Sequence, residues 1–230
     1  LADAGFYFHE SSWREYSRGF YETYVYPTQA PAGFWPEGGG IVVNYSTVTA
    51  MAVSLYGEVT GDSRARQAVD RTLPFLRFFA FPDGTTSVVG DCRQRYSHRP
   101  QLLVPPGLLR YRDGIALCLQ RVRTFRRNLR DETLTDNAGL GLAFFASFVH
   151  RLFASEDLET PSEIGAAENE SPPVAVPVSR IESSTWQCYI SGQLAPETPN
   201  RFHLDAQNFV EAWHRESGYL VGGGNSKYMP

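Results

Sequence analysis

In the first two thirds of the chain, apolar residues recur at the spacing of helix faces. The clearest helix covers about 48–59, with Ser46 or Thr47 as its N-cap and Gly61 as its stop. Its apolar face comprises Val48, Met51, Ala52, Leu55, Tyr56 and Val59. The pattern therefore predicts an amphipathic helix preceded by a glycine-rich loop.

The same spacing occurs in three further segments: 13–24, 65–76 and 107–126. Pro74 is expected to kink or split the last turn of the helix that contains it, because proline cannot donate a backbone hydrogen bond. The segment 140–153 is apolar nearly all round, which predicts a helix buried on two sides. Residues 10–153 are thus predicted to be helical, with long loops.

The end of the chain has the pattern of strands. In TWQCYIS, apolar Trp186, Cys188 and Ile190 alternate with polar neighbours, which predicts a half-buried strand with these three side chains inward. NFVEAW and GYLVGG predict two more strands, joined by a turn at 216–218.

Residues 156–184 separate the two patterns. They are rich in acids, prolines and small residues, with no basic residue before Arg180, which is typical of a linker or extended strap. Helices followed by strands indicate two layers or domains rather than alternating βαβ units. We predict a mostly α chain with a β C-terminal part: 1–155 helical, 156–184 a strap, and 185–230 the start of a sheet domain.

Composition narrows the possible functions. The chain is 42% hydrophobic and 20% charged, with a net charge of −4, as in ordinary soluble domains. We expect neither a nucleic-acid partner nor a membrane partner, because the net charge is negative and no apolar run reaches spanning length. Three scattered cysteines predict neither a disulfide framework nor a zinc site. The ends, Leu1 and Pro230, predict a piece of a longer protein or a mature form without its signal peptide.

The basic residues are almost all arginine, since Lys227 is the sole lysine. Arginines cluster in 121–130 and again at 93–99. A guanidinium group binds carboxylates through a two-pronged fork, so these clusters are candidates for holding an acidic ligand. The alternative for 121–130 is a solvated helix face.

Reactive residues concentrate in three segments. The first is GFWPEGGG, with Trp35 and Glu37, followed by Asn44 and Tyr45 at the head of the 48–59 helix. Aromatic faces stack on sugar rings, an acid binds hydroxyls and glycines let a sugar chain approach the backbone, so this composition favours a carbohydrate cleft. The alternatives are a hydrophobic plug of Phe34 and Trp35, and a Glu37 that merely caps backbone N–H groups.

The second segment is 81–98, where a Pro-Asp-Gly turn leads to a group of polar residues: Asp91, Arg93, Arg95, Tyr96 and His98. The third is NRFHLDAQNF, in which His203 and Asp205 share one face if the segment is a strand. Asp91 is equally interpretable as part of a structural ion pair, and His203 with Asp205 as a hydrogen-bonded pair. No metal is predicted, because two ligands are too few for a site.

These motifs, taken in order over residues 10 to about 215, resemble the heparinase II/III-like and alginate lyase group of polysaccharide lyases. The resemblance implies an incomplete (α/α) toroid of helical hairpins followed by the first strands of a β-sandwich, in a periplasmic or secreted protein. Tyr45 matches the toroid tyrosine of that group and His203 the sandwich histidine. Two features depart from the group: HLDAQNF is poorer in histidine, and no Asn-His pair is present to neutralise the substrate carboxylate.

The resemblance implies β-elimination on an acidic, uronate-containing polysaccharide, without a cofactor. Such a site neutralises the uronate carboxylate, removes the adjacent proton and protonates the leaving oxygen. The predicted catalytic residues are Tyr45, His203 and Arg93. The predicted substrate-binding residues are Trp35, Glu37, Asn44, Asp91, Arg95 and Tyr96.

Two other functions stay open at this point. One is inverting glycoside hydrolysis on a helical toroid, with Glu37 as general acid and Asp83 or Asp91 activating water, at a carboxyl separation of roughly 6.5–9.5 Å. The other is a non-catalytic glycan-binding module. The two enzyme mechanisms require their reactive side chains to converge, whereas the binding module does not.

Overall fold

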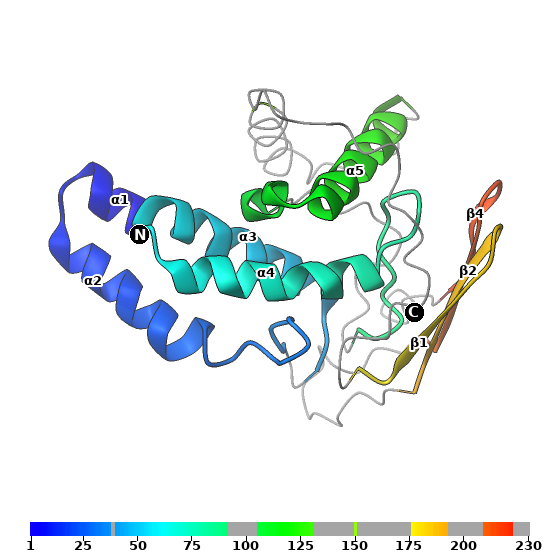
Figure 1. Ribbon diagram of the computed structural model, residues 1–230, viewed down its shortest axis with the longest axis horizontal. Helices are drawn as coiled ribbons and strands as arrows, with labels where there is room; N and C mark the ends of the chain where they lie inside the picture. Colours follow the sequence, from blue (N-terminus) through cyan, green and yellow to red (C-terminus); the bar gives the residue numbers. More distant parts are fainter. Residues whose placement is uncertain (38–39, 92–104, 131–149, 151–175, 193–208, 223–230) are drawn as a thin grey trace, which may run out of the picture.

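The computed structural model describes residues 1–37, 40–91, 105–130, 150, 176–192 and 209–222. Its helices are α1 (Ala2–Tyr7), α2 (Ser11–Phe20), the π-helical turn η1 (Tyr21–Val25), α3 (Val43–Thr60), α4 (Ser63–Phe78), the 3-10 turn η2 (Pro106–Arg110) and α5 (Arg112–Arg130). Its strands are β1 (Val178–Glu182), β2 (Trp186–Ser191), β3 (Val210–His214) and β4 (Gly218–Val221). A helical layer and a sheet stand side by side (Figure 1).

The helical layer is built on the hairpin of α3 and α4. α3 ends at Gly61, which has a left-handed φ of 72°, and Asp62 then caps α4 by accepting a hydrogen bond from the Arg64 N–H at 2.9 Å. The two helices pack through buried alanines and valines, including Ala50, Val53, Ala65 and Ala68. No helix in the part of the chain that the structure describes is both long and apolar enough to cross a membrane.

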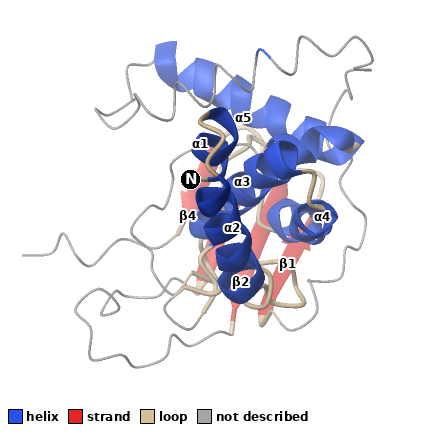
Figure 2. Ribbon diagram, turned by 90° about the vertical axis from the view of Figure 1, so that its left-hand side faces the viewer, coloured by secondary structure: helices blue, strands red, loops and turns tan. Residues whose placement is uncertain are grey.

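Four antiparallel strands form one sheet in the order β1-β2-β3-β4. The sheet lies beyond the C-terminal end of α4 in Figure 1 and behind the helices in Figure 2. Its inner face joins the same hydrophobic core as the helices: the Tyr189 ring stacks on Phe79 and meets Phe81 edge-on, and Trp213 stacks on Phe81. Helices and sheet therefore share a core.

Strand β2 presents the opposite face to the one predicted from its sequence. Trp186 and Ile190 are 42% and 46% exposed, whereas Gln187 and Tyr189 are buried. The buried polar atoms are satisfied by the backbone that follows α4: Gln187 Nε2 donates to Ala80 O at 3.0 Å, and the Tyr189 hydroxyl donates to Phe78 O at 2.5 Å. Such hydrogen bonds offset the free-energy cost of burying polar groups. The alternation of apolar and polar residues therefore predicted the wrong inward face for β2.

The predicted strap extends too far towards the C-terminus. Residues 178–182 form the edge strand β1, with Val176 and Val178 buried in the core. Prolines beside this segment favoured a linker, but an edge strand tolerates proline at its margin. The structure thus shows a mixed helical and antiparallel β fold.

Helix boundaries also shift from those predicted. α3 begins at Val43, and α4 runs without a break through Pro74 to Phe78. The helix predicted over 107–126 is divided at Tyr111, whose extended backbone separates η2 from α5. The helix predicted over 13–24 corresponds to α2 and η1. The helix predicted over 140–153 lies outside the described residues, except for His150, which is helical.

Candidate functional site

The N-terminus of α3 is held by a residue from a distant segment. Its N-cap, Val42, has no side chain that can accept a hydrogen bond, and the backbone N–H of Val43 donates instead to Asp91 Oδ1 at 2.7 Å. An acid at this position also faces the positive end of the helix dipole. The bond joins the first reactive segment of the sequence to the second.

Asp91 is 1% exposed, and its environment opposes ionisation. Burial raises the pKa of the Asp91 carboxyl well above its ordinary range, and the negative charges of Glu211 and Glu37 raise it further. The hydrogen bond from Val43 acts in the opposite direction but does not compensate. Three carboxyl groups from three separate segments are therefore in electrostatic contact.

Glu211 belongs to the inner face of β3, opposite Tyr189 of β2. It is 1% exposed, and its two carboxylate oxygens lie 3.2 and 3.4 Å from the Val88 backbone N–H, which donates to them. Glu211 is not among the site residues predicted from the sequence. The available signal was an acid on the same face of the predicted strand as Trp213, because residues two apart in a strand point the same way.

Three predicted site residues lie at or near the head of α3. Asn44 and Tyr45 occupy its first turn, and both are partly buried. Glu37 is also partly buried, and its backbone forms a short bridge with Gly40, with N–O distances of 3.0 and 3.3 Å. The structure thus brings Glu37, Asp91 and the first turn of α3 to one place.

Trp35 has a different role from the one predicted. It is 6% exposed in the helical core, and its ring Nε1 donates to Val25 O at 2.9 Å. Phe34 packs against Phe75, with ring centroids 5.3 Å apart. Trp35 therefore has no face open to a sugar, and the alternative of a hydrophobic plug describes this part of the loop.

Asp83 is engaged in holding the fold. Its Oδ1 accepts the backbone N–H of Thr85 at 3.0 Å, which closes the Pro-Asp-Gly turn, and its Oδ2 accepts Trp213 Nε1 at 3.2 Å. Trp213 lies on β3, so Asp83 also ties the turn to the sheet. Both carboxylate oxygens have structural partners, which argues against Asp83 as a base that activates water.

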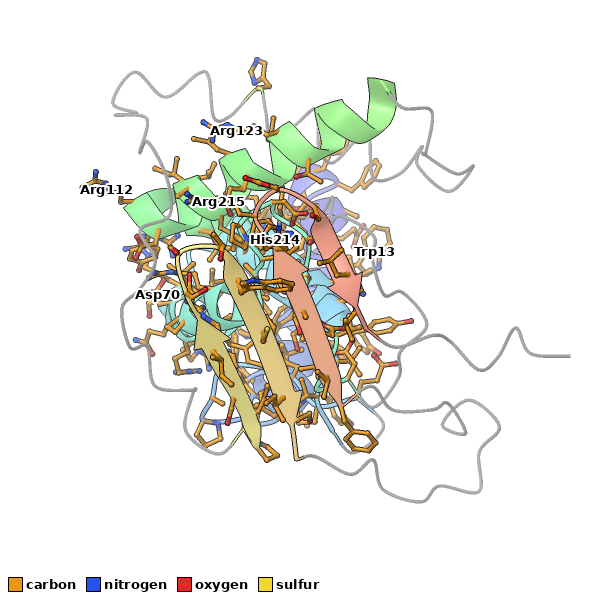
Figure 3. The ribbon with its side chains drawn as sticks, turned by 90° about the vertical axis from the view of Figure 1, so that its right-hand side faces the viewer. Trp13, Asp70, Arg112, Arg123, His214 and Arg215 are labelled. Atoms are coloured by element: carbon orange, nitrogen blue, oxygen red, sulfur yellow. The ribbon has the colours of Figure 1, made fainter. Side chains whose placement is uncertain are left out.

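The arginines of α5 divide between interior and surface. Arg121 is 1% exposed, and burial lowers the pKa of its guanidinium to about 10. Arg123 is exposed and points away from the sheet, as does Arg112 at the start of the helix (Figure 3). The interpretation of 121–130 as a solvated face is therefore wrong for Arg121 and holds for Arg123.

Four predicted site residues lie outside the described residues: Arg93, Arg95, Tyr96 and His203. Their convergence with Tyr45 stays a prediction. Among the residues that are described, no three histidines, cysteines or acids are grouped so that they could hold a metal ion.

The resemblance to α/α-toroid polysaccharide lyases thus rests on short motifs. The loop before α3 (apart from residues 38–39), Tyr45, the Pro-Asp-Gly turn and Asp91 fall on described residues, whereas His203 does not. This resemblance predicts helical hairpins followed by a sheet, and the described residues contain the hairpin of α3 and α4 and one C-terminal sheet. These elements alone do not make a complete toroid or a two-sheet sandwich. Comparison of the chain with protein-family models, with curated proteins and with solved structures found no match.

Proposed function

We propose that the protein acts on carbohydrate, as a polysaccharide lyase that cleaves an acidic, uronate-containing glycan by β-elimination. One observation supports this most strongly: Asp91 accepts a hydrogen bond from the backbone N–H of Val43, and the charge of Glu211 raises the pKa of Asp91. The first segment, at the head of α3, therefore meets Asp91 of the second, and Glu211 of β3, which follows the third segment in the sequence, acts on Asp91 through its charge. Packing of helices against a sheet does not by itself require such convergence.

In this proposal Tyr45 and His203 exchange protons with the substrate. One removes the proton from the carbon next to the uronate carboxylate. The electron pair of the broken C–H bond forms a double bond to the neighbouring ring carbon as the bond from that carbon to the glycosidic oxygen breaks, and the other group protonates this oxygen. Arg93 pairs with the uronate carboxylate, which lowers the cost of the negative charge that develops there. The products are a shortened chain and an unsaturated sugar.

The remaining polar residues of the site bind and position the glycan. Glu37, Asn44, Arg95 and Tyr96 supply donors and acceptors for hydroxyl and carboxyl groups. Asp91 is too deeply buried to meet the sugar directly, and it acts by fixing the first turn of α3, which carries Asn44 and Tyr45. The finer fold proposed with this function is an incomplete toroid followed by the first strands of a β-sandwich.

The proposal is tested by incubating the protein with alginate, heparin and hyaluronan while following the absorbance of the unsaturated product. We expect absorbance to rise with at least one polymer and to be lost in Tyr45→Phe, which removes the phenolic proton carrier. Tyr24→Phe is the matched control, because Tyr24 is an exposed tyrosine of η1. Absence of product with every uronate polymer, or unchanged turnover in Tyr45→Phe, would contradict the proposal.

A second candidate is inverting glycoside hydrolysis. Glu37 and Asp91 lie near enough for the charge of Glu37 to raise the pKa of Asp91, but a buried carboxyl that resists ionisation is poorly suited to activating water. The products distinguish this reaction from β-elimination. With hydrolysis, neutral or acidic glycans would release reducing ends without any unsaturated product, and Glu37→Gln would stop the release. Binding of a glycan without either product would instead identify a non-catalytic binding module.

A further inference from the structure

A cavity of about 390 Å³ lies between α1, α2 and α3, at the end of the helical layer far from the sheet (Figure 1). Its lining residues are Leu1, Ala2, Asp3, Tyr16, Ser17, Phe20, Tyr21, Ala52, Leu55 and Tyr56. Neither the head of α3 nor any residue of the proposed glycan site takes part in it. The volume falls within the range of small-molecule sites in proteins.

Aromatic rings dominate the cavity, and two of them are fixed in place. Tyr21 and Tyr56 are stacked, with ring centroids 3.8 Å apart and planes inclined by 14°. The Tyr21 hydroxyl donates to Ala52 O at 3.1 Å, which holds this ring against α3. Tyr16 and Phe20 complete the aromatic wall and keep much of their surface exposed.

The cavity contains a single carboxylate among its lining residues, that of Asp3. Asp3 is solvent-exposed but lies close enough to the aromatic wall for its charge to act on the Tyr21 hydroxyl. An aromatic wall next to a carboxylate is electrostatically complementary to a cation.

Five lining side chains of the cavity carry a polar group, but Ser17 and Tyr56 are each only 6% exposed and the Tyr21 hydroxyl is already bonded to Ala52. The Tyr16 hydroxyl and the Asp3 carboxylate are the two on exposed residues, which argues against a sugar as the ligand. A sugar ring carries several hydroxyls that need partners once they leave water. An organic cation needs only aromatic faces and one negative charge.

We propose that the cavity between α1, α2 and α3 binds a small organic ammonium ion, with its alkyl groups against the rings of Tyr16, Phe20 and Tyr21 and its charge facing Asp3. The site is separate from the head of α3, so this inference does not depend on the proposed glycan chemistry. It assigns a second ligand class to the chain, one that is recognised by cation–π contact rather than by hydrogen bonds.

The test compares choline with its neutral isostere 3,3-dimethylbutan-1-ol, which replaces the quaternary nitrogen with carbon. Binding is measured by saturation-transfer NMR and isothermal titration calorimetry at low ionic strength. We expect choline to bind about tenfold more tightly than the isostere, because only choline gains the cation–π and carboxylate attractions. Equal binding of the two compounds, or no binding of choline, would overturn the proposal.

Two variants and one control locate the site. Tyr16→Leu removes an aromatic face and Asp3→Asn removes the charge, and each is expected to weaken choline binding severalfold while leaving the isostere unaffected. Tyr7→Leu is the control, since Tyr7 is an 80% exposed tyrosine of α1 outside the cavity. Thermal melting confirms that all three variants are folded. Choline binding that survives both variants, or that Tyr7→Leu weakens equally, would place the ligand elsewhere and contradict the assignment.

Discussion

Individual polar side chains, as well as apolar ones, join the sheet to the helices. Gln187 and Tyr189 direct their polar atoms at carbonyl groups just after α4, and Gln187 Nε2 also donates to the Tyr189 hydroxyl at 2.6 Å. Because Tyr189 is completely buried, its hydroxyl has no access to water if these partners are lost. Burial accordingly raises the pKa of Tyr189 above its ordinary value, which keeps the hydroxyl protonated as a donor.

The first prediction concerns this hydroxyl. Tyr189→Phe leaves the Phe78 carbonyl and one Gln187 donor without their partner, so we expect it to lower the free energy of unfolding by about 1–3 kcal/mol. Tyr7→Phe makes the same chemical change on an exposed ring and should alter stability by less than about 0.5 kcal/mol. Urea unfolding of the three proteins measures both values. Equal stability of the Tyr189 variant and the wild type would show that the hydroxyl is not bonded as described.

A second residue-scale prediction concerns the charge of Asp91. Its pKa is raised in the folded state, so between the ordinary value of about 4 and the raised value the unfolded chain ionises while the native state stays protonated. Stability should therefore fall as pH rises through this window, and Asp91→Asn should remove that fall. The asparagine side-chain oxygen still accepts the Val43 N–H.

We expect Asp91→Asn to be more stable than the wild type at pH 7, by more than the ~0.5 kcal/mol typical of surface changes. Glu15→Gln, on the exposed side of α2, is the matched control for loss of one negative charge. Urea unfolding between pH 4 and pH 9 gives the comparison. A variant that is less stable than the wild type across this range would refute the assigned cost of ionising Asp91.

At the scale of elements, the ends of α3 show what local sequence determines and what it does not. Its C-terminus was predicted correctly, because Gly61 supplies a left-handed conformation whatever surrounds it. Its N-terminus was predicted at Ser46 or Thr47, but the helix begins at Val43 because Asp91 caps it from another segment. A cap that comes from 48 residues away leaves no local signal.

The candidate site divides in the same way. The clustering of Glu37, Asn44 and Asp91 in reactive segments was visible in the sequence, but Trp35 was misassigned because an aromatic residue in a glycine-rich loop fits a core as well as a cleft. Glu211 was missed because a buried acid in a strand depends on partners that only tertiary structure supplies, here the Val88 N–H. Tertiary contacts outweighed local pattern in each case.

The prediction at this scale compares two glycines with positive φ. Gly33 has a φ of 90° and lies against α4, where an added Cβ would overlap the Arg71 carbonyl, whereas Gly61 has a φ of 72° and open space around it. Gly61→Ala should cost about 1 kcal/mol from its left-handed backbone alone. Gly33→Ala should cost on the order of 3 kcal/mol, because overpacking against a helix backbone adds to that strain. Equal losses in urea unfolding would contradict the close approach of the loop to α4.

At the scale of the whole molecule, the sheet and the helices behave as one packed body in the described residues. Phe79 and Phe81 follow α4 directly, and their rings contact Tyr189 and Trp213 from two strands of the sheet. The sequence indicated two layers or domains, and the described helices and sheet form two layers that share one core, with the sheet closing one end of the helical layer (Figure 2). The acids at the head of α3 lie along this junction.

At this junction Glu211 of the sheet lies near Asp91, which caps α3, and the proposed function requires the two acids to be close together. The most direct test is the pKa of the Asp91 side chain, followed by carboxyl-carbon NMR in the wild type and in Glu211→Gln, with Glu15→Gln as control. Because the charge of Glu211 contributes to the raised pKa of Asp91, its removal should move the Asp91 titration to lower pH. The control should leave the titration unchanged. An identical Asp91 titration in the wild type and in Glu211→Gln would mean that the sheet does not bring its acid to the head of α3.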